Sequence, residues 1–267
     1  MRHPSGGPKR LLVLLAVLLT APAADAQDGR PAILRDVGIE PRLGRAVPMN
    51  VPLNEAGRTL ELRRIVRGRP SILALVYYRC PMLCGQVLSG LVSGLGLVTL
   101  DAGADFEVVV VSIDPRESSR LAAERRKALF PPARAREARG WHFLTAQKAS
   151  IDRLADAVGF RYAYDARNDQ FAHAAAVFVL TPSGRLSRAL YGIEYAPLDL
   201  RLSLVEASAG RVGSVVDQVL LYCFHYEPEK GRYGATIMGI LRLGALATLF
   251  GVVFLIFRLH RPSRGGA

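Results

Sequence analysis

Ser71-Ile-Leu-Ala-Leu-Val-Tyr-Tyr-Arg-Cys80-Pro-Met-Leu-Cys84-Gly85 is the stretch that decides the fold of this 267-residue chain. It opens with an almost continuously apolar run, which is typical of a central strand buried on both faces. A helix-like stretch follows from about Leu83 to Leu97, despite its glycines. The two cysteines therefore lie where a buried strand is expected to end and a helix to begin.

The chain beyond these cysteines alternates between strands and helices. Apolar runs, serine caps and a Thr-Pro-Ser-Gly turn at 181–184 place the elements. The expected elements are a strand at 106–113, a helix from Ser118 toward Leu129, a helix from Ser150 to about Val158, a strand at 160–164, a hairpin at 175–180 and 186–193, and a helix at about 198–209. This order predicts an α/β, thioredoxin-like sandwich over residues 70–212.

The N-terminal segment has the composition of a targeting sequence. Residues 1–26 combine a basic start, an apolar core at Leu11–Leu19 and an Ala24-Asp25-Ala26 cleavage site, so we expect a cleavable signal peptide. An uncleaved anchor is the alternative, but the apolar core is short for a membrane span. Residues 27–69 are rich in Gly, Pro and Arg, and we expect them to form an extended arm.

A second apolar run lies near the C-terminus. Residues 235–257 match the length that crosses a bilayer as a helix, so a C-terminal transmembrane helix is expected. A buried core helix is the alternative. The tail at 258–267 is basic and is expected in the cytoplasm. The main domain and a juxtamembrane segment at 213–234 would then lie on the periplasmic side of the cytoplasmic membrane.

Charge and cysteine content narrow the function classes. The net charge is +12, but the expected targeting and membrane segments contribute to it. Nucleic acid is not an expected partner of an exported chain, whereas an acidic protein or anionic lipid would suit a mildly basic face. The cysteines are Cys80, Cys84 and Cys223. An odd number in an exported protein leaves at least one thiol outside disulfide pairing, and that thiol must be used or protected.

The Cys80 and Cys84 pair is a candidate metal or redox site. A helix N-terminus presents unpaired N–H groups and a positive dipole end. We expect these to lower the pKa of a nearby thiol and to make the metal-binding thiolate more available. The spacing allows either a disulfide or two ligands to one ion. A purely structural disulfide, common in exported proteins, is the simpler alternative.

His173 is the candidate third ligand. It lies just before the predicted hairpin, where a thioredoxin-like fold would bring it beside the strand-to-helix turn. Two soft thiolates and one imidazole suit Cu(I) and can also hold Cu(II), whereas structural zinc usually takes four ligands. Taken alone, a histidine among alanines is more often a packed or surface residue.

These features together resemble a known family. The resemblance is carried by Cys80-x-x-x-Cys84, Ser112-Ile-Asp-Pro-Arg-Glu117, His173 and Leu180-Thr-Pro-Ser-Gly-Arg185. The chain is similar to SCO1/SenC proteins. The resemblance implies a thioredoxin-like fold, copper bound by Cys80, Cys84 and His173, and a role in maturing the binuclear copper centre of cytochrome c oxidase. It implies a metallochaperone rather than an enzyme, with the copper-bearing oxidase subunit and an upstream copper donor as partners. The expected C-terminal helix adds the membrane, and the need to keep the cysteine pair reduced in an oxidising compartment adds a thiol-reducing system.

Some positions depart from the family pattern or have no assigned role. The spacer Pro81-Met82-Leu83 is apolar where many members are polar, and Ser118 stands where a second acidic residue is expected. Met82 could add a thioether ligand, although packing or docking is the simpler interpretation. Cys223 and His225 could form a second soft metal site. The alternative is a juxtamembrane thiol beside an aromatic belt.

A thiol–disulfide oxidoreductase is the competing function. Cys80 and Cys84 would then be the redox-active pair, with one thiolate attacking and the other resolving a mixed disulfide with the oxidase subunit. Dedicated oxidoreductases usually carry two residues between their cysteines and need no imidazole. The wider spacing and His173 therefore favour copper binding, and outside this pair no catalytic residue is assigned.

Overall fold

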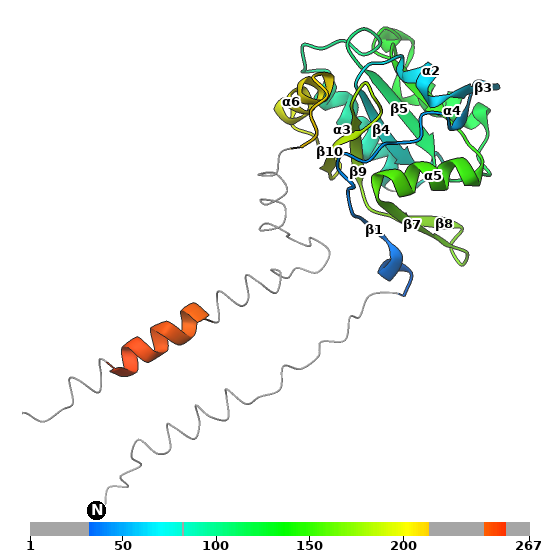
Figure 1. Cartoon of the computed structure of the whole chain (residues 1–267). Helices are drawn as coiled ribbons and strands as arrows, with labels where there is room; N and C mark the ends of the chain where they lie inside the picture. Colours follow the sequence, from blue (N-terminus) through cyan, green and yellow to red (C-terminus); the bar gives the residue numbers. More distant parts are fainter. Residues whose placement is uncertain (1–31, 82, 214–242, 255–267) are drawn as a thin grey trace, which may run out of the picture.

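The computed structural model describes residues 32–81, 83–213 and 243–254 (Figure 1). Between Ala32 and Ser208 the chain forms a layered domain of strands and helices. The elements are η1 (Ala32–Asp36), β1 (Gly38–Ile39), β2 (Pro52–Glu55), β3 (Arg58–Glu61), α2 (Leu62–Val66), β4 (Ser71–Val76), α3 (Leu83–Leu95), β5 (Glu107–Ser112), α4 (Ser119–Leu129), η2 (Pro132–Arg134), β6 (Trp141–Leu144), α5 (Lys148–Val158), β7 (Phe160–Asp165), β8 (Gln170–His173), β9 (Ala176–Leu180), β10 (Leu186–Tyr191) and α6 (Pro197–Ser208).

A five-stranded sheet in the order β10-β9-β4-β5-β6 lies at the centre of the domain. β4 is parallel to β5 and antiparallel to β9, and β5 is parallel to β6. Every residue of β4 and β5 is buried, as their apolar sequences predict for strands covered on both faces. The predicted central strand and the predicted antiparallel hairpin, β9 and β10, are both confirmed.

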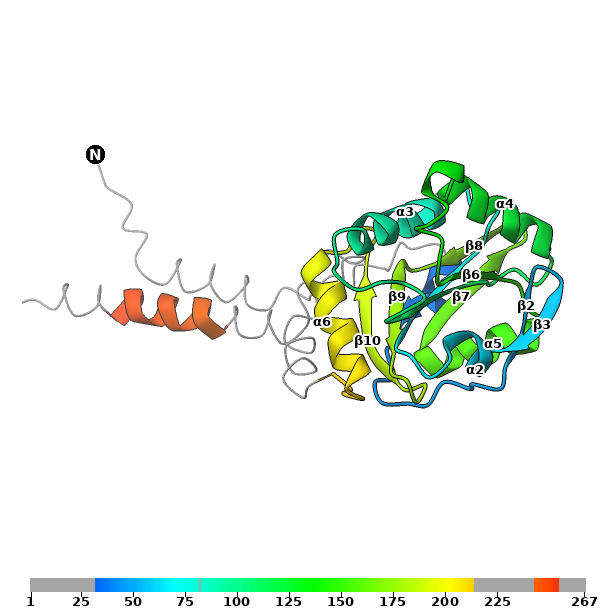
Figure 2. The same cartoon turned by 90° about the horizontal axis from the view of Figure 1, so that it is seen from above.

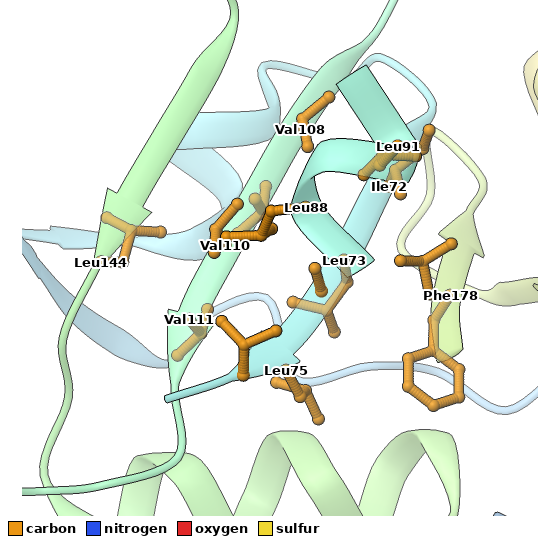
Figure 3. Packing of buried hydrophobic residues seen from close by; sticks show 14 of the residues in the cluster. Ile72, Leu73, Leu75, Leu88, Leu91, Val108, Val110, Val111, Leu144 and Phe178 are labelled. Carbon is orange, nitrogen blue, oxygen red and sulfur yellow. The ribbon is translucent and has the colours of Figure 1, made fainter. Parts of the chain in front are cut away.

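Helices cover both faces of this sheet. α3 and α4 lie on one side, and α2 and α5 lie on the other (Figure 2). Because successive side chains of a strand point to opposite faces, β4 supplies both layers of the core. Leu88 and Leu91 of α3 lie on the side of Ile72, while Leu73 and Leu75 point to the other side (Figure 3). The α/β sandwich of the expected fold is therefore present.

The two predicted serine caps have different outcomes. The Ser118 hydroxyl caps α4 and accepts a hydrogen bond from the N–H of Leu121 at 3.3 Å. Ser150 does not cap α5, because that helix already begins at Lys148 and buries Ser150 within it. The preceding turn follows Thr145, which exchanges two backbone hydrogen bonds with Asn54 of β2. The pairing of Thr145 with Asn54, which are far apart in the sequence, therefore accompanies the earlier start of α5.

The segment expected as an extended arm is part of the domain. It contributes β1, the β2–β3 hairpin and α2. Val51, Leu53 and Leu62 from this segment are completely or almost completely buried. Apolar residues scattered among Gly, Pro and Arg fill gaps in a core built by other elements, so they form no periodic pattern of their own.

A second sheet, in the order β1-β7-β8, lies beside the central one. β7 and β8 form an antiparallel hairpin that extends along the edge of the domain (Figure 1). The sequence predicts β7 but leaves residues 170–173 in a loop. In the structure these residues form β8, in which His173 pairs with Tyr162.

The C-terminal part of the expected fold is wrong. No helix in the described part of the chain is long and apolar enough to cross a membrane. Of the expected span at 235–257, residues 243–254 are described, as one helix. The expected signal peptide at 1–26, residues 214–234 and the tail at 258–267 lie outside the described residues.

Candidate metal centre

Cys80 and Cys84 lie in the connection from β4 to α3. β4 ends at Val76, the N–H of Cys80 donates to the carbonyl of Tyr77 at 3.3 Å, and α3 begins at Leu83. Cys84 therefore lies in the first turn of α3. Both cysteines are buried, and neither is in a disulfide. The predicted strand-to-helix location of the pair is confirmed.

The buried carboxylate of Glu117 holds the backbone of this connection. It accepts hydrogen bonds from the N–H groups of Tyr78 and Arg79 at 2.8 and 2.7 Å. It also accepts one from the Ser112 hydroxyl at 2.6 Å. The sequence presents Glu117 only as the end of an acidic motif, and no local pattern indicates that it binds a backbone segment so distant in sequence. It is the main residue of the site that sequence reasoning misses.

Arg125 of α4 holds the other side of the same connection. Its guanidinium donates to the carbonyl of Tyr78 and, at 3.3 Å, to that of Cys80. Beside it lies a pocket of about 180 Å³ that reaches the Cys84 side chain. The pocket is lined by Tyr77, Tyr78, Cys84, Gly85, Leu88, Ser89, Arg125, Ala128 and Leu129. The pocket lies between residues of α3 and α4 and includes Cys84 in its lining.

His173 reaches the cysteine pair from β8. Its Nε2 lies 3.1 Å from the Sγ of Cys84, and its Nδ1 lies 3.0 Å from the carbonyl oxygen of Ala174. A carbonyl oxygen can only accept, so Nδ1 carries the proton in a neutral ring. Nε2 then keeps its lone pair and can accept the Cys84 S–H or bind a metal ion. The predicted approach of His173 to the turn is thus observed for Cys84.

Aromatic rings surround the imidazole. The His173 ring centroid lies 6.0 Å from that of Tyr77 and 5.7 Å from that of Phe160. Phe171 packs against Tyr77 with ring centroids 5.5 Å apart. Burial among these rings lowers the pKa of His173, because desolvation disfavours the imidazolium. The ring is therefore neutral at neutral pH, which is the form that binds metal.

The protonation of the thiols differs from the sequence expectation. Hydrogen bonding to Cys80 and burial raise the pKa of Cys84 far above its ordinary value. The expected lowering of the pKa is therefore wrong for Cys84, because hydrogen bonding to Cys80 and the loss of water outweigh the backbone hydrogen bond that lowers it. Burial and the hydrogen bond to Cys80 likewise raise the pKa of Tyr77. Cys84 is therefore a neutral thiol in the metal-free protein, and a metal ion must displace its proton.

The donor types fit a soft metal, but the three donors do not converge in this arrangement. Cys84 contacts His173, and Cys80 interacts with Cys84. Nevertheless, no group of three His, Cys, Asp or Glu side chains in the described residues is arranged to hold a metal ion. Two thiols and an unprotonated imidazole nitrogen remain a donor set suited to copper. Met82, Cys223 and His225, the other candidate ligands, lie outside the described residues.

Comparisons with known proteins agree on the fold. A protein from Aquifex aeolicus VF5, provisionally described as an electron transfer protein, matches with 25% identity and a TM-score of 0.56 over 62% of this chain and 95% of its own. Arabidopsis thaliana ScoI with copper bound matches with 19% identity and a TM-score of 0.50, over 62% and 99% of the two chains. BsSco matches with 17% identity and a TM-score of 0.50, over 64% and 98%.

Sequence comparison extends this likeness from fold to family. No curated protein sequence matches the chain. The sequence model of the SCO1/SenC family, however, matches residues 53–198. This match covers more than half of the chain and includes the cysteine pair, Glu117 and His173. The chain therefore belongs to the SCO1/SenC family.

Proposed function

We propose that this protein is a copper-binding assembly factor that delivers copper to the binuclear copper centre of cytochrome c oxidase. The observation that carries the proposal is the 3.1 Å contact between the Cys84 Sγ and the His173 Nε2, beside a second buried thiol at Cys80. Thiolate sulfur binds Cu(I) strongly, and imidazole nitrogen adds affinity for Cu(II). Copper is the cargo of this site, so the site must release the ion as well as bind it.

Family membership supports the proposal. The related Arabidopsis thaliana ScoI was crystallised with copper bound, and BsSco is described as a member of the Sco family of cytochrome c oxidase assembly proteins. In the present chain, Cys80, Cys84 and His173 would hold the ion. Copper uptake would release the Cys84 proton, while Nε2 of His173 is already unprotonated because Nδ1 donates to the Ala174 carbonyl.

The alternative function is reduction of the oxidase-subunit cysteines before they receive copper. The interaction between Cys80 and Cys84 favours it, because two adjacent thiols can form and resolve a mixed disulfide. Cys84, whose pKa is raised, would serve as the resolving thiol and Cys80 as the attacking one, so the thiols alone do not separate the two functions. The neutral imidazole beside Cys84 favours copper binding, because it is a good metal ligand and thiol–disulfide exchange does not need it. Copper delivery is therefore the better-supported function.

Copper titration of the full-length protein tests the site. Cys80→Ser and Cys84→Ser should each abolish tight binding of Cu(I) and Cu(II). His173→Ala should chiefly weaken Cu(II), because two thiolates can still hold Cu(I) in a linear arrangement. His142→Asn, which changes a histidine at the opposite end of the central sheet, is the matched control and should bind like wild type. A Cu(II)–thiolate absorption band that His173→Ala leaves unchanged would remove His173 from the site.

A cellular experiment separates delivery from reduction. We also propose that the site works outside the cytoplasm, where disulfides form readily, so that a thiol-reducing system must keep the pair reduced. Cells without the protein should lose oxidase activity when copper is limiting. Added copper should partly restore that activity, because mass action can load the oxidase subunit directly. Rescue by an added thiol reductant and not by copper would support the reductase instead.

A further inference from the structure

The hairpin that carries His173 is joined to the central sheet by little backbone pairing. β7 and β8 belong to the separate β1-β7-β8 sheet. β8 leads through Ala174 and Ala175 directly into β9, so its end at His173 is tethered by the chain. The opposite end, the turn between Asp165 and Gln170, projects away from the central sheet (Figure 1). The contacts of this outer end with the loop after β5 are made by side chains.

Arg116, in the loop after β5, is firmly fixed on its own side. Its Nε and Nη2 each donate to the Asp114 carboxylate at 2.8 Å, and its backbone N–H donates to the same carboxylate at 2.9 Å. Asp114 is almost fully buried. Burial alone would raise the pKa of Asp114, but the hydrogen bonds and charge of Arg116 lower it overall. The guanidinium is thus locked to an ionised group of the main domain.

The remaining face of the same guanidinium binds the hairpin. Its Nη1 donates to Asp169 at 2.7 Å and to the Tyr164 hydroxyl at 3.1 Å. The Tyr164 hydroxyl in turn donates to Asp169 at 2.7 Å. The guanidinium carbon also lies 4.9 Å from the ring centroid of Tyr164 and 5.9 Å from that of Phe171, within reach of cation–π attraction. Both strands of the hairpin therefore contact Arg116.

These contacts lead to the candidate metal centre. Phe171 packs against the guanidinium and lies two residues before His173. Because side chains in a strand alternate between its two faces, both side chains lie on the same face of β8. Phe171 and His173 both pack against Tyr77, at ring-centroid distances of 5.5 and 6.0 Å. Tyr77 begins the connection that contains Cys80. A shift of the hairpin would therefore displace His173 relative to the thiols.

We propose that Arg116 is a positioning residue that fixes the β7–β8 hairpin to the Asp114 loop and so holds His173 against Cys84. The effect of Arg116 on copper binding rests on the proposed function. Its effect on the position of the hairpin rests on the observed contacts alone. Arg116 is suited to this task because its planar guanidinium serves two carboxylates and two rings at once. A lysine, with a single point charge, could not form this set of contacts.

The experiment compares metal-free and copper-loaded forms of the full-length protein. In the metal-free form, Arg116→Ala should accelerate amide hydrogen exchange at 160–173 while leaving β4 and β5 protected. In the loaded form, it should weaken Cu(II) binding about 10-fold and diminish the nitrogen hyperfine signal in electron paramagnetic resonance. Cu(I) affinity should stay near that of wild type, because the thiolates are unchanged. Arg116→Lys should not restore either property.

Two further variants keep the test decisive. Arg120→Ala removes an arginine that is 89% exposed and pairs with Glu124 at 3.6 Å, so it is the matched control and should change nothing. Asp169→Asn leaves the buried Asp114–Arg116 pair intact and retains a residue that tolerates the positive φ of 50° at this position. It should show smaller changes in the same direction as Arg116→Ala, and it decides the matter if Arg116→Ala does not fold.

The outcomes distinguish this inference from the proposed function. Unchanged hydrogen exchange in the hairpin of the variants would overturn the role of Arg116, whatever the protein binds. Faster exchange with unaltered Cu(II) spectra would also overturn it, because His173 would not depend on the hairpin position. If wild type failed to bind copper, the proposed function would fall, while the metal-free exchange experiment would still judge whether Arg116 holds the hairpin.

Discussion

Glu117 shows how a single buried side chain sets the geometry of the cysteine connection. Its carboxylate accepts three hydrogen bonds, from Tyr78, Arg79 and Ser112. Two of these come from consecutive backbone N–H groups immediately before Cys80. An ionised acceptor roughly doubles the strength of such bonds, and an unpaired buried N–H is costly. The position of Cys80 therefore depends on Glu117.

Replacing Glu117 by Gln tests this dependence. The amide keeps a similar shape but loses the charge and turns an NH2 group toward backbone N–H donors. We expect the free energy of unfolding to fall by about 1–3 kcal/mol, and copper affinity to fall with it. Chemical denaturation and copper titration measure the two effects. Glu124→Gln on α4, where Glu124 pairs only loosely with Arg120, is the control. Equal losses in both variants would contradict the role of Glu117.

At the scale of residues, the sequence predicts the candidate metal ligands better than the side chains that hold them in place. The cysteine spacing and an isolated histidine are sufficient to place Cys84 near His173, because fold order determines which segments meet. Glu117 and Arg116 leave no comparable signal, since their partners are backbone groups or residues far along the chain. The direction of the pKa shift of Cys84 is predicted wrongly for the same reason. Burial is a tertiary property that the helix N-terminus alone does not reveal.

At the scale of elements, α3 illustrates why glycine within a helix can be required. The sequence predicts this helix despite its glycines. An added Cβ at Gly90 would lie 1.9 Å from the carbonyl oxygen of Ile193, and one at Gly94 would lie 2.6 Å from that of Tyr195. These glycines allow α3 to approach the segment after β10 closely. Gly85, by contrast, has nothing within 4 Å of such a Cβ.

This difference gives a matched pair of substitutions in one helix. Gly90→Ala should destabilise the protein by about 1–3 kcal/mol or more, because backbone must move to relieve the overlap. Gly85→Ala should be neutral or stabilise by up to about 1 kcal/mol, since alanine is the better helix former. Thermal and chemical unfolding of the two variants measures the contrast. Similar stabilities would show that α3 does not depend on this close packing.

Elements formed by distant partners are those that the sequence misses. β8 is short and of mixed polarity, and it becomes a strand by pairing with β7. The start of α5 follows the pairing of Thr145 with Asn54. Ser118, whose cap is a contact with the N–H three residues ahead, is predicted correctly because the interaction is local. For these elements, the confirmed prediction rests on a contact between residues close in sequence, and the missed features involve partners far apart in the sequence.

At the scale of the whole molecule, a partly buried histidine joins segments from three parts of the chain. His142 of β6 places its Nδ1 2.8 Å from Glu55 of β2 and its Nε2 3.3 Å from Glu107 of β5. Glu107 also pairs with Arg69 at 2.6 Å. Burial lowers the pKa of His142, but hydrogen bonds and charges from Glu55 and Glu107 outweigh it and raise the pKa overall. The cluster ties the N-terminal segment, expected as an extended arm, to the central sheet.

This arrangement predicts how stability changes with pH. A neutral imidazole would turn a lone pair toward one of its two carboxylate partners, whereas the imidazolium donates to both. Because the folded-state pKa is raised above the unfolded value of about 6.5, protonated His142 contributes stability fully below that value and loses it as pH rises through the folded pKa. The free energy of unfolding of wild type, minus that of His142→Asn, should therefore fall as pH rises from about 6 through the folded-state pKa of His142. Denaturant unfolding across this range measures it. Glu55→Gln, which removes the strongest raising partner, should flatten the dependence, and a difference that grows with pH would refute the assignment of the charge to His142.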